Sequence, residues 1–255
     1  MNKISTKKTV LLSLLSALCY IILYIKIPIP APVGNPFLHF GNMFVLLFSL
    51  MFGGAIGGIA GSVGMGLYDL LNGYHLYAPK TIILKFLMGV TCSLVYAIAN
   101  KKLSEKINAI VLALGVFFLA IGVAIHATYL ATDGIIYIES IDVTLSFSSL
   151  LYIGAYILAV FMLIGYFFAK NKNDDYKCAL FACTCGVFVN LVGEFSLGAV
   201  QYMIMTGTPL SASLILSAIS LPATLLNGII SIIVGVNLFY FIKNKTNLLD
   251  SWKNI

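Results

Sequence analysis

Arginine is absent from this 255-residue chain, and charged residues of all kinds make up only 9% of it. Soluble domains carry roughly 25% charged residues, so a chain this poor in charge could not cover a water-facing surface. The 60% share of hydrophobic residues and the mean hydropathy of +1.02 indicate a polytopic membrane protein instead. The net charge of +6 comes from lysines that lie between apolar runs, and it therefore does not indicate a nucleic-acid partner.

Sequence motifs for catalysis and for nucleotide or metal binding are also lacking. The chain contains no P-loop, zinc motif, nucleophile elbow or glycine-rich dinucleotide motif. Its five cysteines all fall inside apolar segments, which favours buried small residues over metal ligands or disulfides. We therefore expect no enzymatic activity, no cofactor and no metal site. Such a protein moves its cargo passively, uses an ion gradient, or takes energy from a partner.

Apolar runs that are long enough to cross a bilayer predict an all-α transmembrane bundle of about eight helices. We place them at residues 8–25, 38–52, 54–72, 79–99, 107–131, 147–170, 177–205 and 213–242. Lysine clusters precede the first helix, follow the fourth, separate the sixth from the seventh, and follow the last. If these clusters stay in the cytosol, a break at Gly53-Gly54 is needed to put an even number of helices between them. We therefore expect one integral membrane domain over residues 1–255, with both termini cytoplasmic and loop 132–146 outside.

Charged residues inside the predicted helices are candidates for a binding site, because charge in a bilayer is costly and usually functional. Asp69 and Lys85 are expected at similar depths near the outer face. They form either a structural ion pair or contacts to a polar ligand. Lys80 lies nearer the surface, and we expect its side chain to snorkel toward water.

Polar residues of the last two predicted helices point to the same kind of cavity. Glu194 is the deepest acid of the chain, and it shares a helix face with Asn190 and Gln201. It binds a ligand, carries a proton, or accepts hydrogen bonds from its neighbours. Asn227 follows Pro222 by five residues, and a proline at this depth often bends a transmembrane helix toward a cavity.

The loops at the outer face provide a second set of candidates. Residues 26–36 contain four of the seven prolines and cannot be helical, so we expect a stiff, extended lid there. Tyr74 and Tyr77 belong to an interfacial aromatic belt or stack on a flat ring of the ligand. His39 and Asn42 are expected to begin the second helix at this level.

Five motifs between residues 35 and 99 carry a resemblance to a known family. They are Gly41-Asn42, Phe52-Gly53-Gly54, Asp69-Leu70-Leu71 with Gly73-Tyr74, Tyr77-Ala78-Pro79, and Ile83-Leu84-Lys85 with Leu87-Met88-Gly89. With these motifs the segment resembles the substrate-binding S component of energy-coupling factor (ECF) vitamin transporters. The similarity is greatest to the riboflavin, hydroxymethylpyrimidine and pyridoxine-type branch. Leu221-Pro222 with Leu226-Asn227-Gly228 resembles the last helix of that family.

The resemblance implies a subunit without enzymatic activity in the plasma membrane of a prokaryote. Such a subunit captures a small water-soluble vitamin or precursor of the riboflavin, pyridoxine or hydroxymethylpyrimidine class from outside. It docks on a transmembrane coupling subunit with two ATPase subunits, which hydrolyse the ATP. Ser13 and Ala17 match the small-xxx-small docking motif of the family's first helix. The residues that we expect to contact the ligand are Asn42, Asp69, Tyr74, Tyr77, Lys85, Glu194 and Asn227.

The number of helices departs from the family, whose members usually have six. We expect residues 107–170 to be an inserted hairpin between family-like helices over 8–99 and the last two helices over 177–242. Residues 165–169 also resemble the family's fifth helix, which would place the insertion later. An alternative function is that of an autonomous secondary transporter that couples a small nutrient to protons through Asp69 or Glu194. Inverted repeats would favour that alternative, and none is evident in the sequence.

Overall fold

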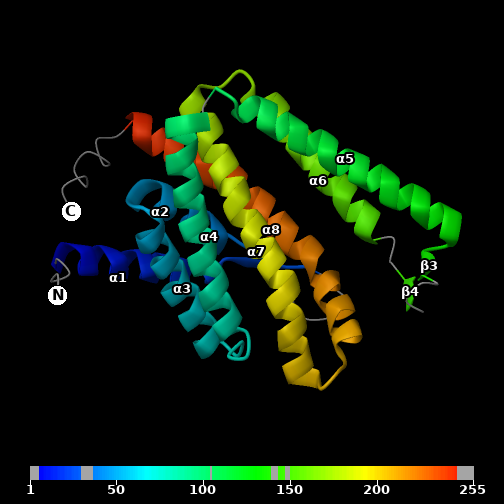
Figure 1. Cartoon of the computed structure of the whole chain (residues 1–255). Helices are drawn as coiled ribbons and strands as arrows, with labels where there is room; N and C mark the ends of the chain where they lie inside the picture. Colours follow the sequence, from blue (N-terminus) through cyan, green and yellow to red (C-terminus); the bar gives the residue numbers. More distant parts are fainter. Residues whose placement is uncertain (1–5, 30–36, 104, 139–142, 147–149, 246–255) are drawn as a thin grey trace. The chain divides into compact units, whose positions relative to one another are not determined.

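The computed structural model describes residues 6–29, 37–103, 105–138, 143–146 and 150–245. Within these ranges the chain forms eight α-helices (Figure 1). They are α1 (Thr6–Ile21), α2 (Gly41–Phe52), α3 (Gly54–Leu71), α4 (Ala78–Ile98), α5 (Ile107–Thr132), α6 (Leu150–Ala169), α7 (Asp174–Thr206) and α8 (Leu210–Lys245). A short 3-10 helix, η1 (Ile22–Tyr24), extends α1, and a π-helical turn, η2 (Ala99–Leu103), follows α4. Seven of the helices are long and apolar enough to cross a membrane, as expected of a polytopic helical bundle.

Two compact units make up the chain. One comprises Met1–Lys101 with Cys178–Ile255, and therefore α1 to α4, α8 and nearly all of α7. The other comprises Lys102–Lys177 and contains α5 and α6, which pack against each other. Inside this second unit, the His126 ring stacks on Tyr152 with ring centroids 4.2 Å apart. That the α5–α6 hairpin is an insertion into a six-helix core stays a prediction.

Helix α2 is shorter than the transmembrane helix expected over residues 38–52. It has 12 residues and therefore rises about 18 Å, less than the hydrocarbon thickness of a bilayer. Its chain reverses at Gly53, whose φ of 92° suits glycine. A side chain at Gly57 would collide with Ser49, and one at Gly61 would collide with Val45. Because these pairs are symmetric about Gly53, α2 and α3 form a tight antiparallel hairpin.

Two short β-hairpins lie in segments that the sequence predicted as loops, except that residues 38 and 39 were predicted to begin the second helix. Strand β1 (Lys26–Pro28) pairs antiparallel with β2 (Phe37–His39), so that Lys26 lies opposite His39. His39 therefore belongs to a strand, and α2 begins at Gly41 rather than at residue 38. The remaining part of the expected lid, residues 30–36, lies outside the described residues. In loop 132–146, β3 (Ile135–Ile138) pairs antiparallel with β4 (Val143–Ser146).

Close contacts between backbones hold the helices around the site. A Cβ atom at Gly89 of α4 would lie 2.7 Å from the Cα atom of Gly58 in α3. One at Gly186 of α7 would lie 2.9 Å from the carbonyl oxygen of Met88 in α4. Small residues thus allow α3, α4 and α7 to approach one another, as is usual between transmembrane helices. Helix α8 contains Pro222 and continues through it as one helix.

Candidate functional site

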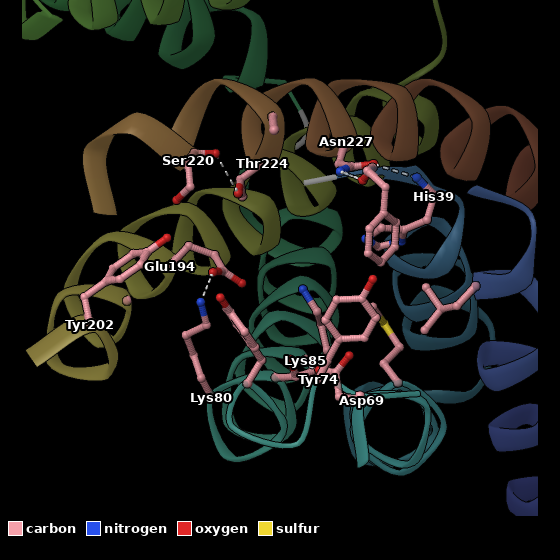
Figure 2. Close-up of a pocket in the computed structure, with 18 residues that line it drawn as sticks. His39, Asp69, Tyr74, Lys80, Lys85, Glu194, Tyr202, Ser220, Thr224 and Asn227 are labelled. Carbon is pink, nitrogen blue, oxygen red and sulfur yellow. Dashed lines mark hydrogen bonds and ion pairs between the residues drawn. The ribbon is translucent and has the colours of Figure 1, made fainter. Parts of the chain in front are cut away.

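A cavity of about 380 Å³ lies among α3, α4, α7, α8 and strand β2, all within one compact unit (Figure 2). Its lining consists of Leu23, Phe37, His39, Met65, Asp69, Gly73, Tyr74, Tyr77, Lys80, Thr81, Lys85, Glu194, Gly198, Tyr202, Ser220, Ala223, Thr224 and Asn227. Aromatic and apolar side chains alternate there with four charged ones. This mixture is typical of sites that bind small polar molecules.

Six of the seven side chains that we expected to contact the ligand line this cavity, and Asn42 does not. Asn42 is buried in α2 with 3% of its surface exposed, and its Oδ1 atom has no hydrogen-bond donor among the described residues. The structure thus brings together residues that lie more than a hundred positions apart in the sequence. That they contact a ligand stays a prediction.

Lys80 and Glu194 form an ion pair across the cavity, with 2.6 Å between Nζ and Oε2. The expectation that Lys80 would snorkel to water is therefore wrong. A partner of opposite charge lowers the cost of a lysine in apolar surroundings, so the pair is favoured over two separate charges. The sequence did not predict this pair, because Lys80 lies in α4 and Glu194 in α7, and the spacing of residues within one helix does not show contacts between helices.

Asp69 and Lys85 also line the cavity, but they are not paired with each other. Asp69 Oδ2 accepts a hydrogen bond from Thr81 Oγ1 at 2.5 Å. Lys85, with only 5% of its surface exposed, donates from Nζ to Asn190 Oδ1 at 2.7 Å. Among the residues that the structure describes, neither has an oppositely charged side chain within 4.0 Å. The structural ion pair between Asp69 and Lys85 that the sequence left open is thus not observed.

Asn227 uses its amide group to hold strand β2. The backbone N–H of His39 donates to Asn227 Oδ1 at 2.9 Å, and Asn227 Nδ2 donates to the Phe37 carbonyl at 2.9 Å (Figure 2). The amide thus bonds to β2 as a neighbouring strand would. This role in positioning the strand was not evident from the sequence.

The imidazole of His39 faces the cavity as a neutral ring. Its Nδ1 atom accepts a hydrogen bond from the Gly41 N–H at 3.1 Å, so the ring proton lies on Nε2. Burial, with the charge of Lys85 second, lowers the pKa of His39 to about 3. The imidazole therefore stays uncharged at neutral pH and presents an N–H donor.

A cluster of aromatic rings holds the other strand of the hairpin, β1. Lys26 Nζ lies 5.0 Å from the ring centroid of Phe37, 5.7 Å from that of Tyr68 and 5.6 Å from that of Tyr74. It also donates to the Tyr68 hydroxyl at 3.1 Å, and this bond raises the pKa of Lys26. Tyr74 therefore serves this cluster as well as the cavity. Lys26 and Tyr68 were not singled out in the sequence, because lysine and tyrosine are common at a membrane interface.

Ser13 and Ala17 do not line this cavity and lie on an exposed face of α1. The opposite face carries Ser16 and Cys19, which pack against α3 around Gly64. Val10, Leu14 and Ile21 are exposed on the same side as Ser13 and Ala17.

Comparison with known proteins yields one family. The family model described as "ECF-type riboflavin transporter, S component" matches residues 3–160. The matched range includes α1 to α5, the β1–β2 hairpin and the cavity residues from α3 and α4. It ends before Glu194 and Asn227. No curated protein and no solved structure matches the chain.

Proposed function

The chain belongs to the family of S components of ECF-type riboflavin transporters, and from this premise we propose that it captures a vitamin from outside the cell for an ATP-driven partner module. Proteins of this family are substrate-binding subunits of transporters and not enzymes. The chain is accordingly a multi-pass membrane protein that binds a small molecule. The vitamin itself, and the coupling to ATP hydrolysis, are our proposal.

The cavity beside the β1–β2 hairpin is the observation that carries the proposal. It combines tyrosine rings with charged and amide side chains. Among the described residues of this unit, no other charged side chain is as buried as Lys85. A flat heteroaromatic ring suits the tyrosines, and polar substituents suit Asp69, Lys85 and Glu194. The ligand is accordingly a compound of the riboflavin, pyridoxine or hydroxymethylpyrimidine class.

Orientation and assembly form the second part of the proposal. With lysine-rich ends inside, both termini lie in the cytosol of a prokaryotic cell, and the cavity opens to the outside. The exposed face of α1 with Ser13 and Ala17 docks on the transmembrane coupling subunit, to which two ATPase subunits bind. Small side chains on that face would permit close approach of a partner helix.

Mass spectrometry of small molecules released from the purified, gently solubilised chain tests the proposal. We expect a stoichiometric vitamin or vitamin precursor, and calorimetry with the same compound then gives its affinity. An empty protein that also ignores a panel of vitamins would contradict the proposal. Uptake into vesicles driven by a pH gradient alone, without ATP or partner subunits, would favour an autonomous transporter instead.

A further inference from the structure

The four charged side chains of the cavity fall into two groups. Lys80 and Glu194 neutralise each other through their 2.6 Å ion pair. Asp69 and Lys85 have only neutral partners, Thr81 and Asn190, among the described residues. The cavity therefore holds one positive and one negative side chain that have no ion-pair partner within 4.0 Å among the described residues.

Both of these groups keep capacity for further hydrogen bonds. The Lys85 ammonium has three N–H donors, of which one is used by Asn190. The Asp69 carboxylate accepts one bond from Thr81 and can accept more at its two oxygens. A buried charge without a counter-charge is costly, so a ligand that supplies the counter-charge gains correspondingly in affinity.

A ligand that fits both groups carries opposite charges itself. A neutral compound would leave both Lys85 and Asp69 without an ion-pair partner, and a singly charged compound would supply a partner to only one of them. The ring centroids of Tyr74 and Tyr77 are 6.4 Å apart, and both side chains line the cavity together with Phe37. These rings favour a flat ligand, and a volume of about 380 Å³ is near the lower end of ligand sites.

We propose that this cavity selects a compact zwitterionic heteroaromatic compound, with an anionic substituent at Lys85 and a cationic ring N–H at Asp69. The inference rests on the proposed function, that the cavity is the vitamin site, and it goes further by naming the charge pattern of the substrate. The inference predicts that a hydroxypyridine zwitterion binds more tightly than a neutral ring system such as riboflavin. His39 contributes a neutral donor, which leaves the balance of charges unchanged.

Calorimetry on the full chain in detergent near neutral pH tests this inference. The probes are pyridoxine, which is a zwitterionic 3-hydroxypyridine at this pH, its 3-deoxy analogue, which is a neutral pyridine without the anionic oxygen and without the ring N–H, and riboflavin, which is neutral. We expect pyridoxine to bind more tightly than either of the others by about tenfold or more. Lys85→Met should lower the affinity for pyridoxine by about tenfold or more. It should change the affinity for the 3-deoxy analogue by less than about threefold.

Two further variants complete the design. Asp69→Asn, which keeps the shape of the side chain, should weaken binding of pyridoxine, whose ring nitrogen is protonated in the zwitterion, and should change the affinity for the 3-deoxy analogue less, because its ring nitrogen carries no proton. Lys245→Met, at an exposed position near the end of α8, is the matched control and should bind like the wild type. If Lys85→Met does not fold, the affinities of the wild type for the three probes test the inference without it.

The outcomes separate the inference from the proposed function. Tighter binding of riboflavin than of pyridoxine would overturn the inference and leave the proposed function intact. An equal loss of affinity for pyridoxine and for its 3-deoxy analogue in Lys85→Met would also overturn the inference and leave the proposed function intact. A wild-type chain that binds none of these probes and releases no vitamin would overturn the proposed function, and the inference with it.

Discussion

At the scale of single residues, Lys85 is the side chain on which ligand binding should depend most. Its only hydrogen bond among the described residues goes to Asn190, so its remaining donors are free for a ligand. We expect Lys85→Ala to weaken vitamin binding more than about tenfold, because a charged hydrogen bond contributes roughly 1.5–3 kcal/mol. Calorimetry on the folded variant measures the effect, with Lys245→Ala as the control. Unchanged affinity would make Lys85 a structural partner of Asn190 only.

His39 should make the stability of the protein depend on pH. Its pKa of about 3 lies below the ordinary value of 6.5, so the folded protein resists protonation that the unfolded chain accepts. Stability therefore falls as the pH drops from about 6.5 toward 3. In the variant His39→Asn, the thermal midpoint should fall less between about pH 7.5 and about pH 5 than in the wild type. An equal fall in both proteins would assign the pH dependence to other groups.

Some residues of the site could be predicted from the sequence, and the reason is their rarity. Asp69, Lys85 and Glu194 are conspicuous because charge is scarce in apolar runs. Their partners were not predictable, since the bonds to Thr81, Asn190 and Lys80 depend on how helices meet in space. A single sequence gives each side chain's depth in a helix but not the neighbour across the cavity.

At the scale of elements, the link between strand β2 and helix α8 is open to a direct test. Asn227→Ala removes both hydrogen bonds to β2 and should lower the free energy of unfolding by about 1–3 kcal/mol. Hydrogen exchange at the His39 amide should become faster, because that N–H loses its acceptor. Asn237→Ala is the control, since Asn237 bonds to Ile233 within α8. Unchanged protection of the His39 amide would show that other contacts hold the strand.

The contact between α3 and α4 allows a second test at this scale. Gly89→Leu places a side chain against the backbone of Gly58, and such overpacking costs typically 1–3 kcal/mol. We therefore expect a lower thermal midpoint in detergent and a smaller yield of monodisperse protein. Gly154→Leu in α6 is the same substitution where a Cβ atom meets nothing within 4 Å. If the two variants have the same thermal midpoint and yield, the contact between α3 and α4 accommodates the added side chain without loss of stability.

Helices and strands differ in how far the sequence predicted them. The long helices agree with their predicted ranges within a few residues, because an apolar run in a membrane has few alternatives to a helix. Helix α2 is the exception, since residues 37–39 pair with Lys26–Pro28 instead of starting it. Strands of three or four residues are too short for an alternating pattern to emerge, and their pairing partners lie outside the local sequence.

At the scale of the whole molecule, assembly with a coupling subunit should depend on α1. Ala17→Leu adds bulk to the exposed face of this helix and should prevent co-purification with the coupling subunit. Vitamin binding should be unaffected, because Ala17 does not line the cavity. Ala97→Leu, at an exposed position of α4, is the matched control. Normal recovery of the complex with Ala17→Leu would exclude this face as the docking surface.

The two attachments of the β1–β2 hairpin differ in kind, and they should therefore respond differently to salt. Strand β1 is held by the exposed ammonium of Lys26 against aromatic rings, a contact that competing cations in the medium weaken. Strand β2 is held by a neutral amide bonded to the backbone, which salt leaves intact. Higher ionic strength should therefore weaken the attachment of the hairpin to α3 and leave its attachment to α8 intact.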